Sequence, residues 1–134
     1  MDDADLVRRA LDARARSYSP YSGFAVGAAL RLDDGSVVTG TNVENASYGL
    51  TVCAERVAVF TAVASGRTGF AALAVATERG ASMCGACRQV VREFAEDLPV
   101  LLADAAGNVT TTSIAALLPG SFGPESLGGE GDAT

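Results

Sequence analysis

The thiol side chains of this chain fall in two short motifs. Cys53 opens the sequence Cys-Ala-Glu-Arg at residues 53–56, and Cys84 and Cys87 enclose a glycine and an alanine. The chain has 3 cysteines and 0 histidines, so these three thiols are its only cysteine or histidine ligands for a metal. A structural zinc site is usually closed by four protein ligands, whereas a catalytic zinc site uses three and leaves one position for water. The motifs therefore predict a catalytic site that binds one Zn²⁺ per chain.

Glu55 is the predicted general acid and base of that site. Side chains two residues apart on a helix do not share a face, so Glu55 is poorly placed as a ligand beside Cys53. It can instead reach across the open side of the metal, take a proton from water and pass it to a ring nitrogen and a leaving amine. Zinc nucleobase deaminases combine three zinc ligands, a glutamate that is not a ligand, and a Cys-x-x-Cys pair. The residue pattern thus indicates a hydrolytic deaminase.

Arg56 is the predicted partner of the sulfur atoms. Three thiolates around Zn²⁺ leave an excess negative charge, which weakens the metal as a Lewis acid. A guanidinium directly after Glu55 can donate hydrogen bonds to the thiolates and draw off part of that charge. The hypothesis assigns Arg56 a supporting role in the metal site.

Three other interpretations of the cysteines have to be weighed. The Cys84 and Cys87 pair also resembles a thioredoxin-type redox motif, but that gives Cys53 and Glu55 no role. A structural zinc module lacks a fourth cysteine or histidine. Buried, inert thiols are common in protein cores, yet here all three lie in motif positions. Counting bound zinc and free thiols distinguishes these interpretations.

Hydrophobic periodicity and turn residues predict the elements that hold these motifs. Both cysteine motifs fall at predicted helix starts, where free backbone N–H groups and the helix dipole stabilise a thiolate. The expected elements are helices at residues 4–16, 51–64 and 84–95, strands at 24–32, 37–39, 70–77, 100–103 and 109–112, and a short helix from Ser113 to Pro119.

This order of elements predicts an α/β fold. Helices that cross over between strands favour a mixed five-stranded sheet between two helical layers, a three-layer α/β/α sandwich. At 134 residues the chain is long enough for one domain, expected at residues 1–127. Residues 128–134 carry no apolar anchor and are expected to form a disordered tail.

Composition excludes several partner classes. The net charge is −6 and the 10 basic residues are all arginine, without a basic stripe, which argues against a nucleic-acid partner. No apolar run is long enough to span a bilayer, so no membrane partner is expected. The acidic N-terminus is unlike a signal peptide, and an odd number of cysteines is typical of a reducing compartment. A cytoplasmic location is the resulting prediction.

Five motifs lie along residues 6–127. They are residues 21–29 (YSGFAVGAA), 42–49 (NVENASYG), 53–56 (CAER), 84–89 (CGACRQ), and 117–119 (LLP) with 122–123 (FG). With these motifs in this order, the chain resembles the small homotetrameric, zinc-dependent cytidine deaminases, and the five together make the resemblance specific.

The resemblance implies a reaction and a set of substrate contacts. Such enzymes hydrolyse cytidine and 2′-deoxycytidine to uridine and 2′-deoxyuridine with release of ammonia, in pyrimidine salvage. By this resemblance Phe24 stacks on the pyrimidine, Asn42 and Glu44 hold the ribose hydroxyls, and the backbone at Ala54 faces the base edge. Tyr48 and Phe122 complete the pocket of a neighbouring subunit, which implies a homotetramer with shared active sites. The ligand roles implied for Cys53, Cys84 and Cys87 agree with the interpretation from spacing.

Some positions stay open. The family usually has proline where this chain has Met83, a change that removes a preset backbone angle but touches no catalytic atom. Gln89 either pairs locally or helps to orient the turn of Cys87. Two alternative functions remain: a zinc-binding homologue without catalysis, and a deaminase of a modified cytosine nucleoside. The presence of both Asn42 and Glu44 favours a plain ribose over the second alternative.

Overall fold

The computed structural model describes residues 2–128 and contains one mixed β-sheet. The strand order is β2-β1-β3-β4-β5. β3 and β4 run parallel and every other neighbouring pair is antiparallel. This confirms the predicted five-stranded mixed sheet. The strands are β1 (Gly27–Leu32), β2 (Val37–Thr41), β3 (Phe70–Ala76), β4 (Pro99–Ala103) and β5 (Val109–Ser113).

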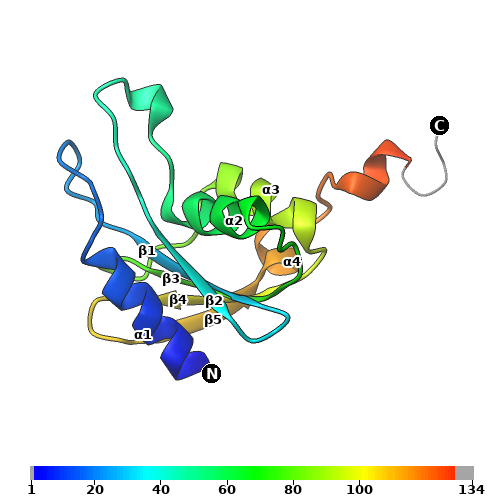
Figure 1. Cartoon of the computed structure of the whole chain (residues 1–134), viewed down its shortest axis with the longest axis horizontal. Helices are drawn as coiled ribbons and strands as arrows, with labels where there is room; N and C mark the ends of the chain where they lie inside the picture. The colour runs from blue at the N-terminus through cyan, green and yellow to red at the C-terminus, as the bar shows by residue number, and fades with distance from the viewer. Residues whose placement is uncertain (1, 129–134) are drawn as a thin grey trace.

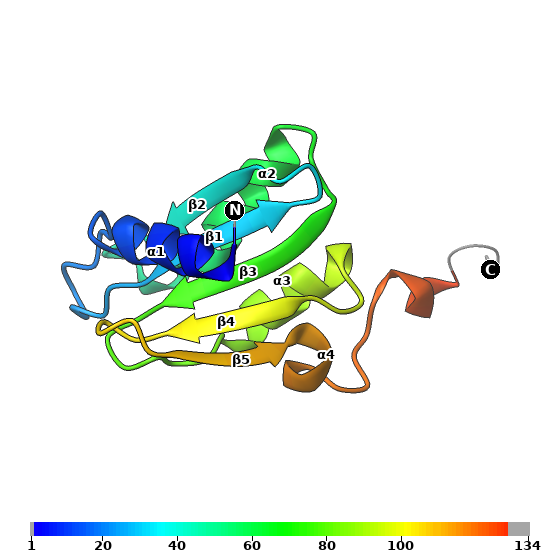
Figure 2. The same cartoon turned by 90° about the horizontal axis from the view of Figure 1, so that it is seen from below.

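Helices cover both faces of the sheet. One face packs against α1 (Asp3–Arg14), and the other packs against α2 (Ala54–Ala64) and α3 (Gly85–Phe94), as Figures 1 and 2 show. α3 is the crossover between the parallel strands, and a short helix, α4 (Ile114–Leu117), follows β5. The three-layer α/β/α sandwich predicted from the sequence is therefore confirmed. None of the helices within residues 2–128 combines the length and apolar character needed to cross a membrane.

The central strand β3 shows why its sequence is apolar without alternation. Leu73 and Val75 face the core beneath α2 and α3, whereas Ala72, Ala74 and Ala76 face α1. Both faces are thus buried, as expected for a strand inside an α/β sandwich. The alanines on one side leave room for α1 to lie close to the sheet.

One glycine decides how closely α2 approaches the sheet. A Cβ on Gly40 in β2 would lie 2.5 Å from the Ala54 carbonyl oxygen and 2.6 Å from the Ala58 nitrogen. Any side chain at Gly40 would push the first turns of α2 away. Because Cys53 directly precedes this helix, Gly40 helps to set the position of the first metal-binding motif.

Two predicted element starts differ by three residues from the observed ones, and the other boundaries differ by at most two. β1 begins at Gly27 instead of Phe24, because the Asn42 side chain binds the backbone of that segment in place of a strand ladder. α2 begins at Ala54 instead of Thr51, because Val52 pairs with Val43 in an isolated bridge and Cys53 has an extended backbone. Both differences arise from contacts between distant segments. The expected disordered tail at residues 128–134 lies, apart from Gly128, outside the described residues.

Candidate metal centre and active site

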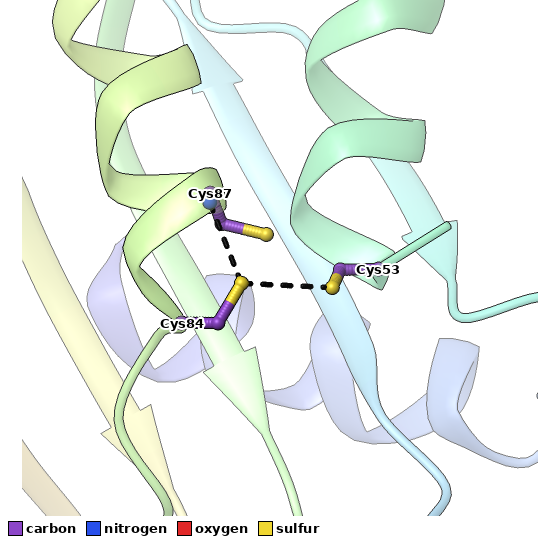
Figure 3. Close-up of side chains that lie close together, drawn as sticks. All are labelled: Cys53, Cys84 and Cys87. Atoms are coloured by element: carbon purple, nitrogen blue, oxygen red, sulfur yellow. Dashed lines mark hydrogen bonds between the residues drawn. The ribbon is translucent and has the colours of Figure 1, made fainter. Parts of the chain in front are cut away.

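Two helix starts meet at the three cysteines. Cys53 precedes α2 and Cys84 precedes α3, both with extended backbone, at ψ 154° and 163°. Cys87 lies in the first turn of α3, and its N–H donates to the Cys84 Sγ at 3.4 Å. Figure 3 shows the three sulfur atoms clustered between the two helix starts. Cys53 and Cys84 at two helix N-caps and Cys87 in a first turn thus bring their sulfurs together in one cluster.

The geometry of the sulfur cluster fits zinc. The three Sγ atoms all lie within 4.8 Å of one another, and the Cys53 and Cys84 sulfurs are 3.8 Å apart. A tetrahedral zinc with Zn–S bonds of about 2.3 Å places pairs of sulfurs about 3.8 Å apart. Within residues 2–128 no other group of His, Cys, Asp or Glu side chains comes together in this way, and Glu55 is not part of the group. The cluster can therefore hold one metal ion with three protein ligands.

The groups around the cluster favour the thiolate of Cys53 and oppose that of Cys87. Hydrogen bonds from Cys87, Arg56 and Cys84 lower the pKa of Cys53, so its thiolate is the preferred form. The Arg56 Nη2 donates to the Cys53 Sγ at 3.4 Å, and this contact raises the pKa of the guanidinium. Its hydrogen bond to the Cys53 sulfur, followed by burial, raises the pKa of Cys87. The Arg56 Nε is also buried and has no acceptor among the described residues, so a second donor lies available beside the sulfurs.

Glu55 is a buried carboxyl next to the cluster. Only 5% of the residue is exposed. Burial raises its pKa to about 7, and the negative charge of Cys53 adds to this effect, whereas its own backbone N–H and Arg56 oppose it. A carboxyl with a pKa near neutrality can accept and return a proton at the working pH of most enzymes. Glu55 therefore has the burial and the pKa required of a general acid and base.

A pocket of about 240 Å³ opens beside Glu55 and the cluster. The pocket brings together six of the residues singled out in the sequence and five that were not. The former are Phe24, Asn42, Glu44, Cys53, Glu55 and Cys84, and the latter are Val26, Thr51, Val75, Thr77 and Ser82.

Among the residues missed by the sequence reading, Thr77 had a recognisable signal. It directly follows the buried strand β3, which pairs in parallel with β4. Ligands of α/β sheets bind at the carboxyl ends of parallel strands. A polar residue at that point is therefore a candidate for the pocket wall.

Asn42 and Glu44 fix the wall that carries Phe24. The Asn42 Nδ2 donates to the Phe24 carbonyl at 2.8 Å, and its Oδ1 accepts from the Val26 N–H at 3.0 Å. The Glu44 Oε1 accepts from the backbone N–H groups of Tyr21 at 2.9 Å and Ser22 at 3.1 Å. The Ser22 hydroxyl donates to the other oxygen, which lowers the pKa of Glu44. The Phe24 ring remains half exposed in the pocket wall, where it can contact a ligand.

The two residues predicted to complete a neighbouring subunit's pocket lie outside this one. Tyr48, in a short 3₁₀ helix (Tyr48–Leu50), is 75% exposed and lines an adjoining hollow of about 410 Å³ that shares Glu44 and Thr51 with the pocket. Phe122 is 59% exposed and belongs to the segment after α4, which extends away from the sheet in Figures 1 and 2. Within one chain, neither residue reaches the sulfur cluster.

Ala54 and Gln89 complete the set of predicted residues. Ala54 is fully buried as the first residue of α2, between Cys53 and Glu55. The Gln89 side chain donates from Nε2 to the Phe122 carbonyl at 2.8 Å, so it contacts the segment after α4 and not the turn of Cys87. That contact spans 33 residues of sequence, so a local interpretation of Gln89 is wrong.

Comparison with known proteins agrees with a zinc-binding deaminase site. The family model described as "Cytidine and deoxycytidylate deaminase zinc-binding region" matches residues 1–102. A cytidine deaminase of Sporosarcina psychrophila is 48% identical over 130 residues, which cover 95% of this chain and 96% of that protein. A cytidine deaminase of Halalkalibacterium halodurans is also 48% identical over 130 residues, covering 95% of this chain and 98% of the relative.

Solved structures give the same picture. The crystal structure of cytidine deaminase from Burkholderia pseudomallei superposes with a TM-score of 0.88 at 49% identity and covers 91% of this chain and 100% of that chain. The cytidine deaminase structure from Mycobacterium tuberculosis has a TM-score of 0.79 at 42% identity, with 92% and 98% covered. The likeness extends over nearly the whole length of both proteins.

Proposed function

The chain belongs to the cytidine and deoxycytidylate deaminase family, and on that premise we propose that it hydrolyses cytidine and 2′-deoxycytidine to uridine and 2′-deoxyuridine with release of ammonia. The observation that carries the proposal is the buried Glu55 carboxyl, with a pKa raised to about 7, in the same pocket as the three-sulfur site. Neither feature would be needed for a protein that only binds a nucleoside.

Cys53, Cys84 and Cys87 would hold the zinc ion. Zinc bound by three protein ligands lowers the pKa of a coordinated water to about 7 and so supplies a nucleophile at neutral pH. In this proposal Glu55 accepts one proton as water adds at C4 of the cytosine ring and passes it to the ring nitrogen. It then takes the remaining proton of the added hydroxyl and passes it to the departing amine. Water is consumed and ammonia is released, so the protons balance within the pocket.

Arg56 would stabilise the sulfur atoms during this proton transfer. Its Nη2 contact with the Cys53 sulfur offsets part of the negative charge of three thiolates. Partners of metal ligands of this kind tune the affinity and acidity of the metal. The role is electrostatic and requires no contact between Arg56 and the substrate.

The pocket wall supports the proposed nucleoside contacts. An ionised carboxylate offers about four lone-pair sites, and Glu44 uses three of them for Tyr21 and Ser22, so one remains for a ribose hydroxyl. Asn42 has two amide hydrogens and uses one for the Phe24 carbonyl, so it can donate the other. Phe24 would stack on the pyrimidine, and the buried backbone at Ala54 would face the base edge.

We further propose that the enzyme works as a homotetramer with shared active sites. Tyr48 and Phe122 expose large aromatic surfaces that no part of the described chain covers, and the hollow beside Tyr48 adjoins the substrate pocket. Aromatic residues of this kind are enriched where subunits meet. A cytoplasmic role in pyrimidine salvage, by a single domain at residues 1–127, is consistent with three free thiols.

The test is a spectrophotometric assay of zinc-loaded protein with cytidine and 2′-deoxycytidine. Wild type should turn over both substrates, and Glu55→Gln should reduce kcat by at least about 10²–10⁴-fold, the usual contribution of a general acid and base. Glu93→Gln, which changes an exposed carboxylate on α3, is the matched control and should leave the rate unchanged.

The alternatives predict different results in the same assay. A zinc-binding homologue without catalysis would show no turnover by wild type and no effect of Glu55→Gln. A deaminase of modified nucleosides would leave both plain substrates unchanged and act on ring- or sugar-modified cytosine nucleosides. Either result would refute the proposed function.

A further inference from the structure

Arg92 is a buried charge without a part in the proposed reaction. It lies near the end of α3, and only 6% of it is exposed. Within residues 2–128, Arg92 and Glu55 are the two acidic or basic residues that are buried. Burying a charge costs free energy unless the charge is paired and hydrogen-bonded. The partners of Arg92 therefore indicate its role.

All partners of the Arg92 guanidinium belong to the segment after α4. Its Nε donates to the Ser121 Oγ at 2.8 Å, and its Nη2 forms an ion pair with Glu125. Gly123 packs against the guanidinium so closely that a Cβ there would lie 2.6 Å from the Arg92 Cζ. Residues 121–125 therefore wrap around one planar cation. The backbone of Gly123 is extended, so the glycine is required for this close approach and not for its conformational freedom.

Phe122 sits in the middle of this wrapped segment. Its neighbours Ser121 and Gly123 both contact Arg92, and its own carbonyl accepts from the Gln89 Nε2 at 2.8 Å. Among the described residues, the hydrogen bonds and ion pairs that join residues 119–127 to the rest of the fold all come from α3. The backbone of Phe122 is thus fixed on both sides while its ring points into solvent.

Residues 121–125 are held in place by α3, yet the Phe122 ring stays exposed. This arrangement favours contact between the ring and a partner molecule. Phe122 lines neither the substrate pocket nor the adjoining hollow of its own chain. A second copy of this chain is the partner that fits, because the hollow next to the substrate pocket is open and lined by Tyr21 and Tyr48. The ring centres of Tyr21 and Tyr48 lie 6.1 Å apart, a distance at which aromatic rings interact favourably.

We infer that Arg92 is a positioning residue: it fixes residues 121–125 so that Phe122 is presented to the substrate pocket of a second copy of this chain. The inference rests on the proposed function. It assigns Arg92 no contact with substrate or metal, so its loss should leave both the zinc content and the chemistry of its own pocket intact.

The test mixes two defective chains. Arg92→Ala keeps its own Glu55 but presents Phe122 poorly, and Glu55→Gln lacks the acid and base but presents Phe122 normally. Arg92→Ala alone should lose up to about tenfold in kcat/KM, no more than Phe122→Ala, because Arg92 acts only through the position of that side chain. Co-assembled with Glu55→Gln, about one site in four should pair an intact Glu55 with a well-presented Phe122 of the neighbour and recover activity.

Controls separate positioning from damage to the fold. Arg67→Ala removes another arginine of an ion pair, with Asp34 in the turn between β1 and β2, and should match wild type. Arg92→Ala should retain one zinc per chain. The double variant Arg92→Ala/Phe122→Ala should be no slower than Phe122→Ala, since both changes remove the same contact. Glu125→Gln, a milder change with a smaller defect of the same kind, replaces Arg92→Ala if that variant does not fold.

Each outcome decides the inference. Wild-type rates for Arg92→Ala, or a defect that co-assembly does not relieve in demonstrated mixed oligomers, would overturn it. Wild type without turnover would refute the proposed function instead. Sedimentation would then still decide the role of Arg92, because Arg92→Ala and Phe122→Ala should weaken self-association alike, and unchanged association in both would overturn the inference.

Discussion

The two ends of α3 have different roles: its start contributes to the metal site, and its end binds the segment that carries Phe122. At its start, Cys84 and Cys87 meet Cys53, and all the groups that the proposed chemistry requires come from one chain. At its end, Arg92 binds residues 121–125 and leaves the Phe122 ring 59% exposed. The first end is complete within a single chain, whereas the second is prepared for a partner. The proposed reaction thus depends on local geometry, and the proposed completion of the pocket depends on assembly.

Removal of one ligand at the metal end should have the largest effect. Cys87→Ser replaces a fully buried thiol with a hydroxyl, a poor zinc ligand. We expect zinc to be lost and activity to fall by at least about a thousand-fold, since a metal contributes several kcal/mol to such a reaction. Elemental analysis and the cytidine assay measure both quantities.

Glu55→Gln is the control for this variant, because it should lose the rate but keep its zinc. Chelation of wild type followed by addition of Zn²⁺ should remove and restore activity. Cys87→Ser with one zinc per chain and a normal rate would show that the sulfur cluster is not the metal site.

Weakening the charge balance of the metal end should have the next largest effect. Arg56→Gln removes the guanidinium that contacts the Cys53 sulfur at 3.4 Å. Loss of a hydrogen-bond partner of a metal ligand typically costs about 10–100-fold in affinity or activity. Competition with a chelator of known affinity measures the change. Equal zinc affinity and an equal rate in Arg56→Gln and wild type would leave Arg56 without the proposed role.

The partner-facing end should give a smaller, different defect. Phe122→Ala should raise KM about tenfold with zinc content unchanged, because a phenylalanine side chain that becomes buried contributes about 1.5–3 kcal/mol. Phe122→Tyr should restore most of the loss. Val109→Ala, which trims an exposed apolar residue in the edge strand β5, is the control and should behave as wild type. If Phe122→Ala lowered kcat and lost zinc, Phe122 would affect the metal site, and the proposed separation of roles between the two ends of α3 would be wrong.

The sequence predicted the metal end far better than the partner end, and the reason is physical. Cys53, Glu55 and the Cys84 and Cys87 pair lie within one turn of helix starts, where short-range spacing determines geometry. The five strands and the helices likewise follow from local periodicity.

Contacts between distant segments carry no such local signal. Arg92 did not stand out in the sequence, and Gln89 was interpreted locally, yet both bind residues about 30 positions away. The Asn42 amide replaces the start of a predicted strand in the same way. Periodicity shows which face of a helix is polar, but not which distant segment the polar face binds.

The smallest expected effect tests Met83, the position where the resemblance implies a proline. The sequence treats Met83 as a lost proline of little consequence, but the structure shows its side chain 2% exposed in the core beside the metal end. Its carbonyl accepts from the Arg88 Nε at 2.8 Å, a contact that proline preserves. Met83→Pro should therefore lose side-chain packing and gain only up to about 1 kcal/mol from a stiffer unfolded chain.

The net result should be a loss of about 1 kcal/mol in the free energy of unfolding, or a few degrees in Tm. Zinc content should be unchanged, since neither Cys84 nor Cys87 moves. Proline also restricts the residue before it, Ser82, to extended backbone, and Ser82 lines the pocket, so a change in KM of less than about threefold is compatible with this account. Calorimetry and the cytidine assay measure these values, with Met83→Leu as the volume-matched control. A marked change in substrate preference in Met83→Pro would mean that this position acts on the pocket and not on the core alone.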